Sequence, residues 1–298
     1  MNSLSATLEK ITVGTSPLGK RAERGELLAD AMLASPFRQL DTSNNYADGE
    51  SERLLGGAIA RAGGLPDDKV IFSKVDADPV TGVFDADRVR RSFDETRERL
   101  GLDTLPLLHF HDPYALSVTE AMAPGGPVEA LTRLRDDGAV GAIGIAAGKR
   151  ALMEEYVRTD AFDAVLNHNR WTLVDRSADT LWNLATERGM TVFNAAPFGG
   201  GILAGSTTRG PKYAYTEASG ELLAFIDRMQ GLASEWGIEL AAAAVQFSTG
   251  DPRIHSTVVG MSSIARLESL PGLASAEIPA GFWDAFHALG TPPASPAA

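Results

Sequence analysis

The chain alternates between short apolar runs and longer stretches in which apolar residues recur every three or four positions. Continuous apolar runs predict buried strands, and three-to-four spacing predicts helices. Eight strands are predicted on this basis, and the run at 38–42 has the weakest pattern. The predicted strands are 11–14, 38–42, 70–75, 105–110, 139–147, 163–168, 191–196 and 256–261.

Helical patterns separate most of these runs. Those at 86–101 and 127–138 are the clearest, and the second closes on a glycine, the residue type that commonly ends a helix. Continuously apolar strands suit a sheet covered on both faces, and about 30 residues per unit suits a strand–helix repeat. The pattern predicts an α/β fold, a single-domain (β/α)8 TIM barrel over residues 1–290, with a flexible Pro- and Ala-rich tail at 291–298.

An open, doubly wound sheet is the alternative architecture. Such sheets commonly carry GxGxxG after the first strand, where its glycines let the backbone approach a phosphate. The first strand of this chain is followed instead by TSPLGKRAERG, which lacks that spacing. The sequence therefore favours the closed barrel.

Composition narrows the possible partners. The net charge is −12 with no basic run, so a nucleic-acid partner is not expected. The absence of cysteine excludes disulfides, thiolate nucleophiles and Cys-ligated metal sites. The N-terminus lacks a signal-peptide pattern and no apolar run approaches the roughly 20 residues that span a bilayer. We expect a cytoplasmic protein, monomeric or a small homo-oligomer, that acts on a small molecule.

Polar side chains follow three consecutive predicted strands. Asp41 and Tyr46 lie in the segment DTSNNYADGESE, Lys74 lies near the end of the third strand, and His109 and His111 end the fourth. Active sites of (β/α)8 barrels lie at the carboxyl ends of the strands, so these side chains are candidates. Taken singly, each residue type also has a more ordinary role at such a position. An Asp after a strand usually caps a helix or forms a turn, a Lys is usually solvated, and a Tyr in a loop usually packs half-buried.

Lys74 is the informative residue of this set. An ammonium inside an apolar strand must pair with a carboxylate, and Asp41 is the nearest candidate, one strand away. A cation close to a phenol lowers its pKa from about 10 towards neutrality, which lets Tyr46 give or take a proton. A neutral imidazole at His111 can hydrogen-bond the same substrate oxygen. The set predicts carbonyl–alcohol interconversion.

The sequence resembles the aldo-keto reductases in these same segments. DTSNNYADGESE is similar to their DTAxxYGxGESE, SKV to their catalytic-lysine strand, and LGLDTLPLLHFHDP to their LGLDYxDLxxxHxP. The resemblance implies a catalytic tetrad of Asp41, Tyr46, Lys74 and His111. In it Tyr46 is the general acid or base, Lys74 lowers its pKa, Asp41 holds Lys74 and His111 orients the substrate oxygen.

Three further segments resemble one branch of that family, the branch that includes L-fucose and D-threo-aldose dehydrogenases and a pyridoxal 4-dehydrogenase. They are GTSPLG, the HDP after the fourth strand, and NAAPFGGGILA. The branch implies oxidation of a hemiacetal or an alcohol with NAD or NADP.

The nicotinamide-holding positions depart from the family pattern. Ala146 and Ala147 stand where the family has Ser and Asn, and their side chains cannot hydrogen-bond an amide. The family's Gln falls on His168 or Asn167, and its stacking Tyr is Ala195. Part of the cofactor clamp is therefore missing or replaced.

Other cofactor contacts are implied along the same strand ends. Phe198 can replace the missing ring beneath the nicotinamide, or it only packs within its loop. Ser262 and Ser263 can hydrogen-bond phosphate oxygens, and Arg266 can meet a 2′-phosphate. The family's Lys before this loop and its Arg-xxx-Asn spacing are not reproduced, so NAD is favoured over NADP. The remaining implied contacts are Thr15, Pro197, Gly200 and Gly260.

Two other functions remain open. His109 and His111 point to the same side of a strand, as in some metal-dependent barrel hydrolases, although further ligands are few. No metal is expected, and His109 is expected to be a buried, hydrogen-bonded neighbour of the tetrad. The eroded nicotinamide contacts also allow a catalytically weak member used for binding.

Overall fold

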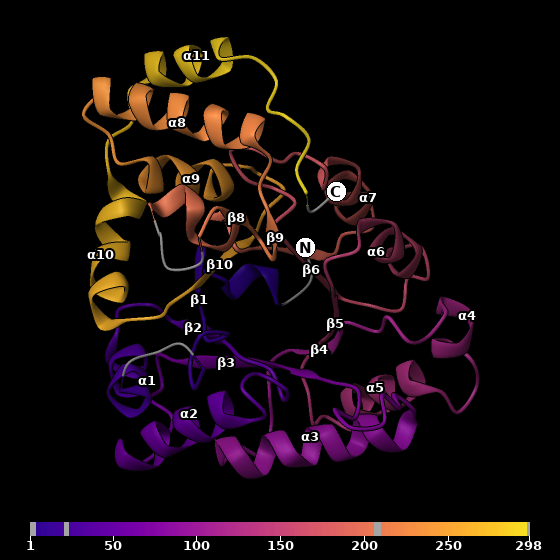
Figure 1. Ribbon diagram of the computed structural model, residues 1–298. Coiled ribbons are helices and arrows are strands. Elements are labelled where there is room, and N and C mark those ends of the chain that lie inside the picture. Colours follow the sequence, from indigo (N-terminus) through magenta and orange to yellow (C-terminus); the bar gives the residue numbers. More distant parts are fainter. Residues whose placement is uncertain (1–3, 21–23, 206–209, 297–298) are drawn as a thin grey trace.

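The computed structural model describes residues 4–20, 24–205 and 210–296. Eight parallel strands close into a barrel in the order β1-β10-β7-β6-β5-β4-β3-β2, which confirms the predicted (β/α)8 fold (Figure 1). The barrel strands are β1 (Ile11–Gly14), β2 (Gln39–Asp41), β3 (Val70–Val75), β4 (Leu108–His111), β5 (Ile143–Ala146), β6 (Ala164–His168), β7 (Thr191–Ala195) and β10 (Ser256–Gly260). Each lies within or across its predicted apolar run.

Helices surround the barrel in Figure 1 and cover the outer faces of its strands. They are α1 (Gly25–Ala34), α2 (Glu50–Arg61), α3 (Ala86–Leu100), α4 (Val118–Ala121), α5 (Pro127–Asp136), α6 (Arg150–Val157), α7 (Asp179–Glu187), α8 (Gly220–Glu235), α9 (Leu240–Thr249), α10 (Ile264–Ser275) and α11 (Ala280–Ala288). Local signals set their ends: in α3 the Asp85 side chain accepts from the Arg88 amide, and Gly101 ends the helix with a φ of 68°.

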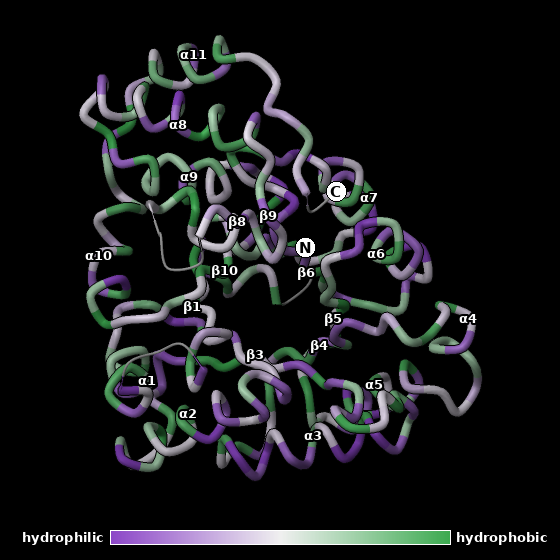
Figure 2. The backbone as a smooth tube through the Cα atoms, viewed as in Figure 1, coloured by the Kyte–Doolittle hydropathy of each residue, from purple (hydrophilic) through white to green (hydrophobic). Residues whose placement is uncertain are grey.

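The barrel interior is filled by apolar side chains, so the barrel is a packed core rather than a pore. Phe72, Leu166, Phe193 and Val258 belong to this interior cluster, and Leu4 joins it from the N-terminal segment. Figure 2 shows hydrophobic residues concentrated on the strands and hydrophilic ones on much of the outer surface. This packing leaves the strand ends as the place where polar side chains can gather.

A two-stranded hairpin, β8 (Lys212–Tyr213) and β9 (Thr216–Glu217), lies between β7 and α8 in the sequence. Tyr213 anchors it, because its buried hydroxyl donates to the Asn169 carbonyl, 2.9 Å away, just after β6. Gly199, with a φ of 56°, makes room for this ring, since a Cβ there would lie 2.4 Å from a Tyr213 ring carbon. The hairpin is thereby held beside the end of β6.

The C-terminal segment 291–296 contains no helix or strand, and residues 297–298 lie outside the described part of the chain. Ser295 in this segment is buried and hydrogen-bonds Tyr213. None of the described helices is long and apolar enough to cross a membrane.

Candidate active site

Lys74 and Asp41 form an ion pair inside the barrel mouth. Lys74 Nζ lies 2.7 Å from Asp41 Oδ1 and 2.5 Å from the Thr42 carbonyl oxygen. Their side chains are only 1% and 4% exposed, so both charges are removed from water. Burial lowers the pKa of Lys74, but Asp41 and Tyr46 together outweigh this effect, so the net pKa is raised and the ammonium stays protonated.

Tyr46 extends from the β2–α2 loop over this pair. Lys74 Nζ lies 4.7 Å from the centroid of its ring. The ring also meets the His111 imidazole edge to face, with centroids 5.8 Å apart and planes at 82°. The structure therefore brings together the four residues of the predicted tetrad at adjacent strand ends, with Tyr46 half-buried at the mouth.

The pKa of Tyr46 differs from the expectation. Burial raises this pKa, Lys74 lowers it, and the Asp41 and Asp76 carboxylates raise it again, so it lies above the ordinary value for a phenol. The predicted net lowering is wrong for the protein without ligands, because one ammonium does not outweigh burial and two carboxylates. The phenol therefore carries its proton at neutral pH in the protein without ligands.

His111 is held by an acidic neighbour that was not among the predicted residues. Its Nδ1 lies 2.7 Å from Asp76 Oδ1 and 3.1 Å from Ser43 Oγ. Burial lowers the pKa of His111, but the Asp76 and Asp112 carboxylates together outweigh this effect, so the net pKa is raised. Asp76 stands two residues after Lys74, and side chains two apart on a strand share a face. That alternation is the sequence signal that could have identified it.

His109 is buried, as expected, but it is not hydrogen-bonded. Neither of its ring nitrogens has a partner among the described residues, and burial lowers its pKa well below the ordinary value. The ring packs edge to face on Phe193, with centroids 5.9 Å apart. Among the described residues no group of three His, Cys, Asp or Glu side chains could hold a metal ion.

The two residues considered for the family's Gln position take different places. Asn167 is buried and donates to the Ala147 carbonyl, 2.6 Å away, while its Oδ1 has no partner among the described residues. His168 lies partly exposed at the strand end, and burial lowers its pKa to about 4. Ala146 and Ala147 are buried. The unpaired Asn167 oxygen is the buried acceptor available to a carboxamide N–H.

The segment after β7 is explained largely by packing. Phe198 packs between two apolar clusters of the core, and Pro197 is buried. A Cβ at Gly200 would lie 2.9 Å from the Ala214 carbonyl oxygen, so this glycine allows the hairpin to approach. Ala195 is buried at the end of β7 and presents no ring.

The loop after β10 leads directly into the N-terminus of α10. Ser263 caps α10, since its hydroxyl accepts from the Arg266 amide at 3.3 Å. The exposed Arg266 guanidinium donates to Ser262 Oγ at 3.0 Å, and Gly260 is exposed at the strand end. Thr15 is buried with its hydroxyl 2.7 Å from Ser51 Oγ, which ties β1 to α2.

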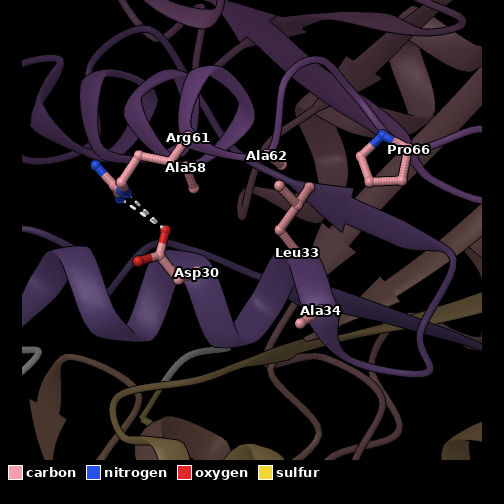
Figure 3. Close-up of a pocket in the computed structure, with 7 residues that line it drawn as sticks. All are labelled: Asp30, Leu33, Ala34, Ala58, Arg61, Ala62 and Pro66. Atoms are coloured by element: carbon pink, nitrogen blue, oxygen red, sulfur yellow. Dashed lines mark hydrogen bonds and ion pairs between the residues drawn. The ribbon is translucent and has the colours of Figure 1, made fainter.

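A cavity of about 340 Å³ lies between α1 and α2, away from these strand ends (Figure 3). Leu33 and Ala58 contribute apolar lining, and the ion pair of Asp30 with Arg61, 2.7 Å long, crosses its edge. Its lining contains none of the tetrad residues. The chemistry therefore belongs to the barrel mouth and not to this cavity.

Most of the chain is similar to proteins of known function. The profile described as the Aldo/keto reductase family matches residues 10–290. Pyridoxal 4-dehydrogenase from Microbacterium luteolum is 28% identical over 95% of this chain and 94% of its own length. D-threo-aldose 1-dehydrogenase from a Pseudomonas species is 32% identical over 85% and 84%. L-galactose dehydrogenase from Arabidopsis thaliana is 28% identical over 86% and 81%.

A solved structure shares the fold. The holo form of an aldo-keto reductase from Bacillus halodurans superposes with a TM-score of 0.77 over 95% of this chain and 92% of that one, at 18% identity. At that level of identity the likeness concerns the barrel alone.

Proposed function

The chain belongs to the aldo/keto reductase family, and from that premise we propose that it oxidises a sugar-like hemiacetal or an alcohol with a nicotinamide dinucleotide. Family membership and the dehydrogenase relatives identify an NAD(P)-dependent oxidoreductase that acts on CH–OH or carbonyl groups. The observation that carries the finer proposal is the convergence of Tyr46, His111 and the buried Lys74–Asp41 pair at one mouth.

In the proposed mechanism the substrate oxygen lies between the Tyr46 hydroxyl and the His111 imidazole. In oxidation the Tyr46 phenolate would take the proton of the substrate O–H as the hydride leaves the carbon, and in reduction the phenol would return that proton to the carbonyl oxygen. Lys74 Nζ, 4.7 Å from the ring centroid, stabilises the phenolate. The hydride would be supplied or accepted by a nicotinamide dinucleotide when one is bound. Asp41 keeps Lys74 in place, so the ammonium does not move towards solvent.

The chain retains groups that fit the cofactor. The unpaired, buried Asn167 Oδ1 would accept from the carboxamide, in place of the two side chains lost at Ala146 and Ala147. Ser262 and Arg266, with the start of α10, would receive phosphate oxygens. We favour NAD, because the segment 260–270 offers a 2′-phosphate only a single cation, Arg266.

Titration of NADH and NADPH fluorescence against the purified protein tests this part. We expect NADH to bind more tightly, and Arg266→Ala to weaken NADPH more than NADH. If neither nucleotide binds at millimolar concentration, the chain is a binding protein that has lost catalysis, the function that the eroded clamp at Ala146 and Ala147 would then support.

Substrate choice is proposed from the mouth and the relatives. Tyr114 and Tyr215 are exposed, and the Tyr215 ring lies 6.0 Å from that of His168. Aromatic rings beside polar groups suit a sugar or a pyridine ring. The relatives include an aldose dehydrogenase and a pyridoxal dehydrogenase by name. Aldoses, pyridoxal and simple aldehydes should be screened with both nucleotides.

Tyr46→Phe tests the assigned chemistry, because it removes the hydroxyl and keeps the ring. We expect turnover to fall by roughly 100-fold or more, with nucleotide binding nearly unchanged. Tyr156→Phe is the matched control, since its hydroxyl is buried in α6 without a partner among the described residues. Wild-type turnover in Tyr46→Phe would refute the role given to the phenol.

A further inference from the structure

Asn44 stands two residues before Tyr46, and α3 binds both polar atoms of its side chain. Asn44 is 3% exposed. Its Oδ1 accepts from Arg88 Nη2 at 2.8 Å, and its Nδ2 donates to the Ser92 carbonyl at 3.0 Å and to Glu95 Oε2 at 3.1 Å. The side chain therefore has one position relative to α3.

The backbone of Asn44 is tied to the strand that carries the buried ammonium. Its amide donates to the Lys74 carbonyl at 3.1 Å, and its carbonyl accepts from Arg99 Nη1 at 2.8 Å. The Tyr46 amide then donates to the Ser43 carbonyl at 3.2 Å, so Asn44 is a central residue of the turn that leads to Tyr46. The position of Asn44 thus sets how the phenol lies over Lys74.

The loop just beyond Tyr46 has a backbone conformation that its own residues do not favour. Ala47 and Asp48 have φ angles of 54° and 57°. Residues other than glycine rarely adopt this left-handed region, and alanine has no polar side chain to favour it, so the surroundings must impose the conformation. The contacts on either side of these two residues therefore determine where the loop lies.

Arg99 of α3 contacts the chain on both sides of Tyr46. Besides the Asn44 carbonyl, its Nη1 donates to Glu52 Oε2 at 3.2 Å, and Glu52 is fully buried. A Cβ at Gly49 would lie 2.5 Å from Arg99 Cζ, so the loop closes tightly over the guanidinium. The loop therefore wraps around a side chain of α3.

These contacts come from one face of α3, here called its polar face. Its members follow one another by three or four residues and are Arg88, Ser92, Glu95 and Arg99. The same face binds the end of β3, because Arg88 Nε donates to the Asp76 carbonyl at 2.9 Å and Ser92 Oγ accepts from the Asp76 amide at 3.1 Å. Asp76 in turn holds His111. One helix therefore positions both the Tyr46 loop and the neighbour of His111.

The burial of Arg88 indicates a role in geometry more than in stability. Its side chain is 4% exposed, and removing such a charge from water offsets much of what its bonds contribute. A guanidinium fork adds direction, because its N–H groups fix several acceptors at once. Proton transfer depends on direction, since donor and acceptor must come within about 2.6–3.2 Å and a misplacement of about 1 Å can lower the rate by roughly 100-fold.

We propose that Asn44 is a positioning residue for the proton exchange: bound by the polar face of α3, it fixes the Tyr46 hydroxyl relative to Lys74 and His111. This inference rests on the proposed function and deepens it. Asn44 is buried behind the turn and acts through Tyr46. It stands at an unspecified position of the family segment DTAxxYGxGESE, so the resemblance itself assigns it no role.

Asn44→Ala removes the side-chain hydrogen bonds and keeps the backbone ones. We expect the rate of hydride transfer in a single turnover to fall about 10- to 100-fold, while the dissociation constant of the nucleotide stays within about 2-fold. A single turnover isolates the chemical step from product release. The number of nucleotide-binding sites per chain, measured on the same sample, prevents unfolded protein from being counted as slow protein.

Asn194→Ala is the matched control. Asn194 is also buried, and its Nδ2 donates to the Trp171 carbonyl at 2.8 Å and to Ser248 Oγ at 2.7 Å. It lies on β7, which pairs with β6 and β10. We expect a comparable loss of stability but a single-turnover rate within about 2-fold of the wild type. An equal fall in both variants would overturn the inference, because destabilisation alone would then explain the loss.

An exchange of donor and acceptor tests the contact itself. Asn44→Asp places a carboxylate where Nδ2 now lies 3.1 Å from Glu95 Oε2, and Glu95→Gln in the double variant returns an N–H to the pair. We expect Asn44→Asp to slow the single turnover, and the double variant to recover at least about 3-fold of that loss. Losses that simply multiply would contradict the inference. Both substitutions keep the volume of the site, so this pair serves if Asn44→Ala does not fold.

Hydrogen exchange in the nucleotide-free protein tests the geometry without activity. In Asn44→Ala we expect loss of amide protection in the segment 42–49 and unchanged protection in β6. Unchanged protection in 42–49 would overturn the inference. If the wild type is active and Asn44→Ala keeps its single-turnover rate, the inference is wrong and the oxidoreductase proposal stands. If the wild type binds no nucleotide and turns over no substrate, the proposed function fails, whereas lost protection in 42–49 still establishes that Asn44 holds the Tyr46 loop.

Discussion

Replacing Lys74 by methionine removes one buried charge and leaves its partner behind. Lys74 Nζ is 2.7 Å from Asp41 Oδ1, and the side chains are 1% and 4% exposed. Methionine fills the space of the lysine stem but cannot pair with a carboxylate. Because breaking a buried pair by removing one partner costs about 3–5 kcal/mol, we expect Lys74→Met to lower the free energy of unfolding by about that amount at pH 7.

The double variant Asp41→Asn/Lys74→Met separates charge from packing. It leaves no unpaired charge in the barrel, and replacing both partners of a buried pair by neutral groups is often close to neutral for stability. We therefore expect it to regain most of the stability lost in Lys74→Met. Turnover should stay low in both variants, because the ammonium under Tyr46 is absent in both.

The pH dependence gives a second check with a definite sign. Burial already raises the pKa of Asp41, and Lys74→Met removes the main influence that lowers it. An acid whose pKa is higher folded than unfolded destabilises the fold at high pH, and the loss fades as pH falls towards its unfolded value near 4. The deficit of Lys74→Met should thus be largest at pH 7 and shrink towards pH 4.

Urea unfolding followed by the fluorescence of the four tryptophans measures these free energies. Two results would refute the reasoning. One is a wild-type free energy of unfolding for Lys74→Met at pH 7. The other is a double variant no more stable than the single, since the loss would then come from packing and not from the orphaned carboxylate.

Two other predictions follow from the packing and burial of particular residues. In α2, Gly57→Ala should raise the free energy of unfolding by about 0.5–1 kcal/mol, because the added Cβ would meet only the movable Arg61 guanidinium. Gly56→Ala should lower it by about 1–3 kcal/mol, because the added Cβ would lie 1.8 Å from the Arg99 carbonyl oxygen. Thermal unfolding measures the stability of both variants, and a Gly56→Ala variant more stable than Gly57→Ala would contradict the prediction. His168, with a pKa of about 4, should stay neutral on folding, so stability should fall as pH drops from about 6.5 towards 4 and His168→Asn should flatten that slope. A His168 NMR midpoint near 6.5 would argue against its burial.

The barrel was predictable because its strands are buried on both faces. A continuous apolar run is the one-dimensional trace of that burial, and the runs at 70–75 and 191–196 coincide closely with β3 and β7. The weak run at 38–42 was also a strand, although only Gln39–Asp41 pair. The carboxyl ends of the strands were therefore known to within one residue, which placed Asp41 and Lys74 at one mouth.

Packing around the loops was not predictable in the same way. The glycines at 199–201 permit either a close backbone approach or a mobile flap, and the sequence does not name what approaches them. In the structure Gly199 and Gly200 lie against Tyr213 and Ala214 of a hairpin more than ten residues away. Phe198 likewise fills space between two core clusters. Such contacts depend on how a loop folds back, and neither periodicity nor a local motif encodes that.

The acidic neighbour of His111 could not be read from the motif either. Asp76 Oδ1 lies 2.7 Å from His111 Nδ1, and Asp76 is 5% exposed, so this carboxylate is part of the site. It lies outside the segments that resemble the family and reaches the mouth because it stands two residues after Lys74, where side chains share a face. The motif therefore identifies the tetrad but not the buried carboxylate that holds one of its members.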